Sequence, residues 1–273
     1  MTKRFSWFNA TSLTLGFAFL YLPILILIVY SFNESKLVTV WAGFSTKWYG
    51  ELFHDKAFRD AAIVTLKVGL ASSTLATVLG TMAAYTLVRA GRFRGRTLFS
   101  GMIYAPLVVP DVITGLSLLL LFISIGMDRG VTTIVLAHAT FTMCYVSVVV
   151  SSRLITFDRS LEEAALDLGC SPWDAFRSVT LPIIAPAVVS GWLLAFTLSL
   201  DDLVIASFAS GPAATTLPMK IFSQVRLGVS PEINALSSIL IGIVTVGVVT
   251  SSIIGKRANI RRRRQEQEAV ANR

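Results

Sequence analysis

The stretch AAIVTLKVGLASSTLATVLGTMAAYTLV, residues 61–88, contains a single charged side chain, Lys67, and is long enough to cross a bilayer as an α-helix. Other apolar runs of comparable length lie along the chain, and short polar stretches that hold most of the charged residues separate them. The six predicted spans are residues 11–32, 61–88, 98–124, 131–152, 186–208 and 234–254. The sequence therefore predicts an all-α, polytopic membrane helix bundle with six transmembrane helices, in which residues 1–273 form one transmembrane domain.

The composition favours a membrane protein. Hydrophobic residues make up 54% of the chain and charged residues 15%, whereas soluble domains have about 25% charged residues. The net charge of +8 does not indicate a nucleic-acid partner, because the Lys and Arg residues flank the apolar runs. With the N-terminus placed inside, sixteen of them lie inside and seven outside, so the positive-inside rule predicts that both termini are cytoplasmic. Trp41, Trp48 and Tyr49 in the first outer loop predict an interfacial segment.

Residues 153–185 form the longest predicted inside connection, and their pattern indicates two short helices. Ser160, followed three residues later by Glu163, is typical of a capping box, and Gly169 suits the left-handed residue that ends a helix. A second helix is expected to begin at Ser171-Pro172 and to stop before Pro182, because proline disfavours a helical residue before it. The result would be a two-helix segment with exposed apolar side chains. An amphipathic turn on the membrane and, more remotely, a DNA-reading helix-turn-helix are the alternatives.

The same connection resembles the EAA loop of permease subunits in ABC importers. The matching residues are Glu163, Ala164, Ala165, Gly169, Val179, Leu181 and Pro182. This resemblance implies that a cytoplasmic coupling helix docks in a groove of a separate ATPase. The implied coupling residues are Glu163, Ala164, Ala165, Gly169, Leu181 and Pro182, with Glu163 tying the two short helices together. The sequence has no G-x-x-x-x-G-K-[ST] loop, so we expect no cofactor and no enzymatic activity in this chain, and ATP and Mg on the partner ATPase.

A wider resemblance extends over nearly the whole chain. Residues 198–203 (LSLDDL), together with residues 210–212, 215–218 and 231–235, are similar to the permeases of bacterial putrescine and spermidine importers, in particular the second permease of putrescine systems. It implies a permease that moves putrescine or other polyamines from periplasm to cytoplasm through the inner membrane. The implied partners are a homologous second permease, an ATPase dimer, a periplasmic substrate-binding protein and membrane lipid. Whether the second permease is identical or different stays open.

Three acidic residues, Asp111, Asp201 and Asp202, lie within predicted spans. Each would cost about 2.5–3.5 kcal/mol at the centre of a lipid-facing helix, so we expect them to face the bundle interior or water. On straight helices Asp111 and Asp201 would lie roughly 20 and 22 Å from the inner end, at similar depth. They are therefore candidates for a substrate pathway that attracts a cation.

A structural reading of the same acids is equally open. Asp201 and Asp202 would cap a helix break or bond neighbouring hydroxyls, and Asp111 would satisfy backbone that Pro110 leaves free. The runner-up function is an ion-coupled secondary carrier, in which the three acids relay ions, although no internal repeat is evident. An ABC permease for another substrate is a further alternative. A membrane enzyme is disfavoured because no catalytic constellation is present; His138, alone in an apolar run, is expected to be packed and hydrogen-bonded.

Overall fold

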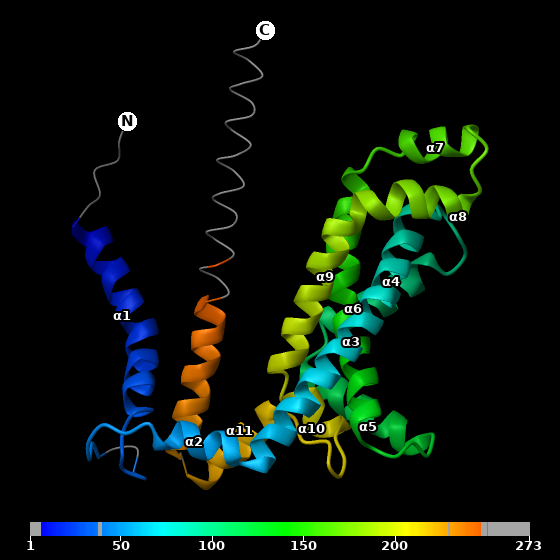
Figure 1. Cartoon of the computed structure of the whole chain (residues 1–273). Coiled ribbons are helices and arrows are strands. Elements are labelled where there is room, and N and C mark those ends of the chain that lie inside the picture. Colours follow the sequence, from blue (N-terminus) through cyan, green and yellow to red (C-terminus); the bar gives the residue numbers. More distant parts are fainter. Residues whose placement is uncertain (1–6, 38–39, 229, 247–249, 251–273) are drawn as a thin grey trace. The chain divides into compact units, whose positions relative to one another are not determined.

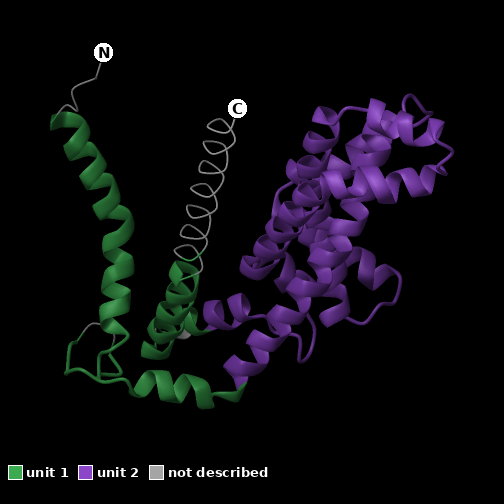
Figure 2. Cartoon of the chain, turned by 45° about the horizontal axis from the view of Figure 1, so that its top comes forward, with its two compact units in different colours: residues 1–56, 224–273 green, residues 57–223 purple. Residues whose placement is uncertain are grey.

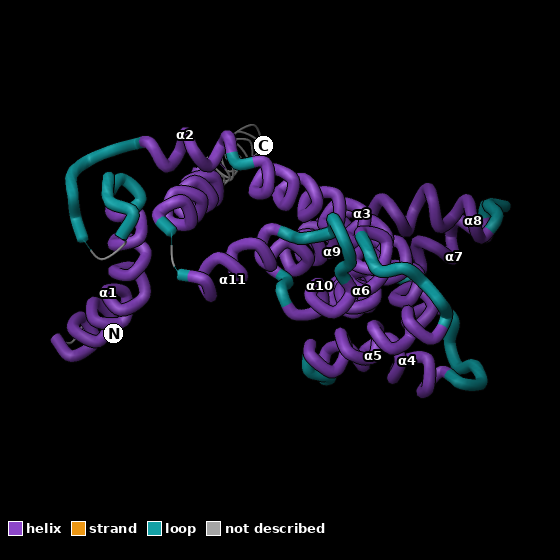
Figure 3. Tube along the Cα trace, turned by 90° about the horizontal axis from the view of Figure 1, so that it is seen from below, coloured by secondary structure: helices purple, strands orange, loops and turns teal. Residues whose placement is uncertain are grey.

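The computed structural model describes residues 7–37, 40–228, 230–246 and 250 of the chain. These residues belong to two compact units, residues 1–56 with 224–273, and residues 57–223 (Figure 2). In the described ranges the secondary structure is helical apart from an isolated β-bridge between Asn33 and Phe44. Figure 3 shows the helices joined by loops of different lengths. The predicted all-α membrane bundle is confirmed.

The first unit contains an apolar helix that its own chain does not cover. This helix, α1 (Trp7–Tyr30), has no buried residue. The loop that follows is organised by Asn33, whose carbonyl accepts a 2.7 Å bond from Trp48 Nε1 and whose side chain donates to the Val40 carbonyl at 2.7 Å. Trp48 belongs to α2 (Lys47–His54), which runs crosswise to α1 (Figure 1). An aromatic-rich crosswise helix agrees with the predicted interfacial loop.

Three long helices form the core of the second unit: α3 (Lys56–Arg89), α6 (Val131–Thr156) and α9 (Leu181–Asp201). Small residues let them approach closely. A Cβ added to Gly80 of α3 would lie 2.6 Å from the Met143 carbonyl oxygen of α6, and one added to Gly191 of α9 would lie 3.2 Å from Val146 Cγ1. Glycine at such contacts is typical of helix pairs that pack within a membrane.

The predicted span at residues 98–124 is a broken pair of helices. It consists of α4 (Arg96–Tyr104), a short 3₁₀ turn η1 (Ala105–Leu107) and α5 (Asp111–Ser124), with a bend of 114°. Pro106 and Pro110 lack the N–H groups that would continue the ladder, which explains the break. The straight helix on which the depth of Asp111 was worked out is therefore wrong, and the depth itself stays a prediction.

The fifth predicted span, residues 186–208, is also interrupted. The helix α9 ends at Asp201, and after Asp202 and Leu203 the short helix α10 (Val204–Ala209) begins. The chain continues through α11 (Leu217–Leu227) to a helix at Pro231–Val246.

Four helices of the described residues are long and apolar enough to span a membrane, and the bent pair is a fifth candidate. The four are Trp7–Tyr30, Lys56–Arg89, Val131–Thr156 and Pro172–Asp201. The helix Pro231–Val246 begins the sixth predicted span, residues 234–254, of which nearly all the remainder lies outside the described residues. The count of six therefore stays a prediction. Residues 1–6 and 251–273 also lie outside them, so the cytoplasmic location of both termini stays one too.

Candidate functional site

The first short helix of the 153–185 connection, α7 (Ser160–Asp167), begins without the predicted capping box. The Asp158 Oδ1 atom accepts the Ser160 N–H at 3.0 Å. Hydrogen bonds from the backbone and the side chain of Ser160 hold the pKa of the exposed Asp158 carboxyl below its usual range. Glu163 instead pairs with Arg159, with 3.1 Å between Oε1 and Nε, and both side chains are more than half exposed. The capping-box prediction is wrong because Ser160 is already the first helical residue, where its hydroxyl has no cap position to fill.

The end of α7 confirms the role predicted for Gly169. This glycine has a φ of 88°, in the left-handed region that favours glycine. The Gly169 N–H donates to the Leu166 carbonyl at 2.9 Å and the Cys170 N–H to the Ala165 carbonyl at 3.1 Å. This pair of bonds is a Schellman motif, and it turns the chain toward the second short helix.

The second short helix begins as predicted but does not end as predicted. Ser171 Oγ accepts the Asp174 N–H at 3.2 Å, with Pro172 as the first residue of α8 (Pro172–Ala175). The helix then passes through a π turn, η2 (Phe176–Thr180), directly into α9, so Pro182 lies in the first turn of α9 and does not stop the helix. A π turn shifts the hydrogen-bond register by one residue, which lets the backbone pass a proline and bend. Figure 1 shows this bend between α8 and α9.

Glu162, which sequence reasoning passed over, ties the connection to the bundle. Its Oε2 lies 3.0 Å from Arg89 Nε at the end of α3, and its Oε1 accepts a 2.6 Å bond from the Thr180 hydroxyl in η2. Arg89 also lies over the Phe157 ring, 5.3 Å from the centroid. The tie predicted for Glu163 is therefore made by Glu162. Glu162 shares a helical face with the buried Ala165, three residues on, and this face of α7 is turned toward the bundle.

The outer face of the same connection is apolar and exposed. Leu161, Leu168 and Trp173 are exposed, Leu168 to 87%. Among the implied coupling residues, Glu163, Ala164, Gly169 and Pro182 are exposed and Ala165 is buried. The prediction of exposed apolar side chains on two short helices is confirmed.

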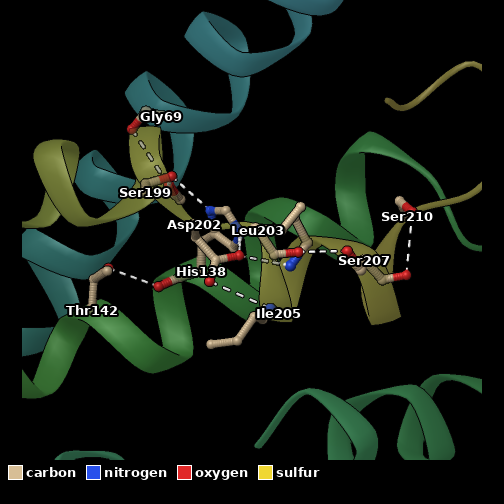
Figure 4. A network of polar contacts seen from close by, with 11 residues as sticks. Gly69, His138, Thr142, Ser199, Asp202, Leu203, Ile205, Ser207 and Ser210 are labelled. Carbon is tan, nitrogen blue, oxygen red and sulfur yellow. Dashed lines mark hydrogen bonds and ion pairs between the residues drawn. The ribbon is translucent and has the colours of Figure 1, made fainter. Parts of the chain in front are cut away.

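Asp202 is engaged by the fold. Its Oδ2 lies 3.1 Å from His138 Nε2 and accepts the Ala206 N–H at 2.7 Å, while its Oδ1 accepts the Ile205 N–H at 3.3 Å. Figure 4 shows this carboxylate between His138 and the start of α10. Asp202 therefore caps the helix break, as the structural reading proposed, and His138 is packed and hydrogen-bonded, as expected.

Asp111 and Asp201 are exposed at the edges of the two breaks. Asp111 is the first residue of α5, where a carboxylate is favourable at the positive end of the helix, and Asp201 is the last residue of α9. Neither carboxylate forms an ion pair within the described residues. Two of the three acids thus remain available for a cation, and their role in a pathway stays a prediction.

In the part of the chain that the structure describes, no group of three or more His, Cys, Asp or Glu side chains could hold a metal ion. The two cysteines are free there: Cys144 is buried in α6, and Cys170 is exposed beside the Schellman turn.

Comparison with known proteins places these features in context. A family model described as "Binding-protein-dependent transport system inner membrane component" matches residues 76–265. The chain is 58% identical, over 94% of each sequence, to the putrescine transport system permease protein PotI of Escherichia coli K12. It is 44% identical, over 89% of this chain and 92% of the relative, to the spermidine/putrescine transport system permease protein PotC of the same strain.

Solved structures share the fold. A chain from the crystal structure of a bacterial ABC transporter involved in the import of the acidic polysaccharide alginate superposes with a TM-score of 0.71, at 20% identity over 90% of this chain and 93% of that one. A second crystal structure, of the alginate transporter in complex with a pentasaccharide-bound periplasmic protein, gives a TM-score of 0.66 at 16% identity over 89% and 92% of the two chains.

Proposed function

Because this chain belongs to the family of binding-protein-dependent transport system inner membrane components, we propose that it is the permease subunit of an ATP-driven importer for putrescine or a closely related polyamine. The observation that carries the proposal is the 58% identity, over 94% of the chain, to a permease named for putrescine transport. The 44% identity to a permease named for both spermidine and putrescine keeps both polyamines in the proposed substrate class.

The second part of the proposal concerns coupling. The exposed face of α7 and α8 docks on a separate ATPase, which belongs to a dimer and binds ATP and Mg. Three exposed apolar side chains, Leu161, Leu168 and Trp173, support this role, because water-exposed Leu and Trp are stabilised when a partner covers them. The implied coupling residues keep their roles: Glu163, Ala164, Gly169 and Pro182 are exposed, whereas Ala165 is buried and Leu181 partly buried beneath the docking face. The proposal puts the connection on the cytoplasmic side and, with it, both termini, as the positive-inside rule predicts.

Glu162 links the docking face to the membrane helices. Through Arg89 it joins α7 to α3, and through Thr180 it joins α7 to the turn that continues into α9. Motion of the docking face would therefore reach two core helices through one buried carboxylate. Rigid links of this kind are what a subunit needs if it is to pass motion from a partner to the membrane.

The third part of the proposal concerns the pathway. Asp111 and Asp201 attract the ammonium groups of the polyamine, whereas Asp202 is committed to the fold. Irregular backbone at membrane depth is tolerated where it lines a cavity or is covered by protein, and both carboxylates flank such irregular backbone. Carboxylates that are exposed on one chain must also be shielded from lipid. This supports a homologous second permease on the other side of the pathway. A periplasmic substrate-binding protein would deliver the polyamine.

The proposal is tested by purification and uptake in cells. The tagged chain, purified from its native host, should copurify with an ATPase. Trp173→Glu should abolish that copurification although the variant reaches normal abundance in the membrane. Cells that lack the chain should lose uptake of labelled putrescine and regain it on complementation. Normal putrescine uptake without the chain, or purification without any ATPase, would reject the proposal.

A further inference from the structure

A continuous chain of hydrogen bonds surrounds His138 and joins three core helices. Ser72 of α3 donates to Ser199 of α9 at 3.0 Å, and Ser199 Oγ lies 2.7 Å from His138 Nδ1 in α6. His138 Nε2 lies 3.1 Å from Asp202 Oδ2 (Figure 4). Because a carboxylate only accepts, the neutral imidazole carries its proton on Nε2, and Nδ1 then accepts the Ser199 proton. Each member of the chain thus fixes the orientation of the next.

The hydrogen-bonded side chains from Ser72 to Asp202 are shielded from solvent. Ser72 is 0% exposed, His138 1% and Ser199 4%, and the side chain of Asp202 is 9% exposed. A buried donor or acceptor that loses its partner cannot turn to water, so its desolvation penalty is not recovered. Replacing His138 with an apolar residue would therefore leave the Asp202 carboxylate and the Ser199 hydroxyl short of a partner at the same time.

Asp202, oriented by His138, holds the start of α10. It accepts the N–H groups of Ile205 and Ala206, which are the first-turn donors of a helix of six residues. Helices this short are not stable by themselves, so the direction of α10 depends on its ends. The Thr133 hydroxyl of α6 holds the other end through the Ala209 carbonyl at 2.8 Å. Both ends of α10 are therefore fixed by side chains of α6, with Asp202 as the intermediary at the start.

The helix α10 is in turn locked to α5. A Cβ added to Gly115 of α5 would lie 2.6 Å from the Phe208 ring and 3.4 Å from the Ile205 Cα atom. These two helices follow the two breaks in the unit, and each break leaves an exposed acid beside it, Asp111 at the start of α5 and Asp201 just before Asp202. The position of the α5–α10 pair relative to α6 and α9 therefore depends on the contact between His138 and Asp202.

We propose that His138 is a positioning residue for transport: it holds the Asp202 carboxylate over the start of α10, and so sets the α9–α10 break, the α5–α10 pair and the place where Asp201 is presented to the permeating polyamine. His138 does not touch the substrate. The role assigned to it rests on the proposed function, whereas the placement of α10 can be measured without any substrate.

The test compares variants that keep or remove the two hydrogen bonds of His138. His138→Gln retains a donor for Asp202 and an acceptor for Ser199, whereas His138→Leu retains neither. Ser72→Ala is the matched control, because it removes a buried hydroxyl from the same chain without touching Asp202. Asp202→Asn keeps the size of the side chain that caps α10 and removes its charge.

The first readout is the exposure of α10. Ala206 is 0% exposed, so a cysteine placed there in a Cys170→Ala background should resist a maleimide reagent in the assembled transporter, and the same background without the new cysteine reports labelling of Cys144. We expect His138→Leu to raise the labelling rate at position 206 by about tenfold or more, in line with the loss of a hydrogen bond to a charged group. His138→Gln and Ser72→Ala should stay within about threefold of the parent.

The second readout is uptake by the complete transporter in proteoliposomes. For His138→Leu we expect the maximal rate to fall by about tenfold or more with basal ATPase activity retained, and His138→Gln should restore most of it. In the double variant His138→Leu with Asp202→Asn, the two losses should combine less than additively, because His138 acts through Asp202.

The proposal is overturned if His138→Leu leaves both readouts unchanged, if it slows uptake without exposing position 206, or if His138→Gln is as impaired as His138→Leu. If His138→Leu does not assemble, His138→Gln is compared with Asp202→Asn. Position 206 protected in His138→Gln and labelled in Asp202→Asn supports the proposal. Equal protection in the two variants overturns it. Failure of the unmodified chain to take up putrescine would reject the proposed function alone, because labelling at position 206 needs no polyamine.

Discussion

Replacing Glu162 tests whether one buried carboxylate joins the docking segment to the bundle. Glu162→Ala removes the 3.0 Å ion pair with Arg89 and the 2.6 Å bond from Thr180, whose partners are then left at sites that water reaches poorly. The paired side chains of Arg89 and Glu162 are 12% and 11% exposed. Removing one partner of a buried pair costs about 3–5 kcal/mol, and we take about 3 kcal/mol because a little solvent remains.

Glu163→Ala is the matched control, one residue away on the same helix. Its pair with Arg159 is more than half exposed and spaced i, i+4, and such pairs contribute about 0.3–0.5 kcal/mol. Melting temperatures of the purified transporter should therefore fall clearly for Glu162→Ala and hardly for Glu163→Ala. Equal losses of thermal stability in the two variants would refute the reasoning.

Three further predictions concern a turn, a helix contact and the exposed acids. Gly169→Val should destabilise the segment by about 1–2 kcal/mol, because its φ of 88° strains a branched residue, and Gly169→Asn should cost less; thermal unfolding of the transporter compares them. Gly80→Leu should prevent α3 from packing on α6, since even a Cβ would lie 2.6 Å from the Met143 carbonyl oxygen, and the yield of assembled complex should drop, whereas Gly101→Ala, with nothing within 4 Å, should not lower it. Asp201→Asn should reduce polyamine uptake at saturating binding protein with assembly intact, and Asp111→Asn should do so to a smaller extent; unchanged uptake in both variants would remove the pathway role.

The long apolar helices were predictable from the sequence. Residues 61–88 were expected to span and lie within α3 (Lys56–Arg89), and residues 131–152 lie within α6 (Val131–Thr156). A run of apolar side chains that reaches bilayer length has few alternatives to a helix, so composition alone decides the structure.

The breaks were less predictable because prolines permit several outcomes. Pro106 and Pro110 indicate a kink. The 114° bend also depends on the packing of α5 on α10, which no local sequence pattern encodes. Conversely, Pro182 was expected to end a helix, and a π turn carries the helix past it. The size and even the existence of a break therefore depend on tertiary contacts.

The site residues show the same limit. The spacing of Glu163 and Gly169 led to the docking segment, and Gly169 adopts the expected conformation. Which of two adjacent glutamates faces inward depends on the roll of α7 against α3, and that roll is set by Arg89 and Thr180, distant in sequence. Likewise, only the folded chain distinguishes Asp202, which caps α10, from its neighbour Asp201.

The most direct measurement of the proposed activity is putrescine accumulation in proteoliposomes that contain the complete purified transporter and excess binding protein. With ATP and Mg on the side of the ATPase, and with ionophores that dissipate proton and sodium gradients, labelled putrescine should accumulate against its gradient, and Trp173→Glu should abolish accumulation. Accumulation that requires an ion gradient and is indifferent to ATP would contradict the assignment and favour an ion-coupled carrier.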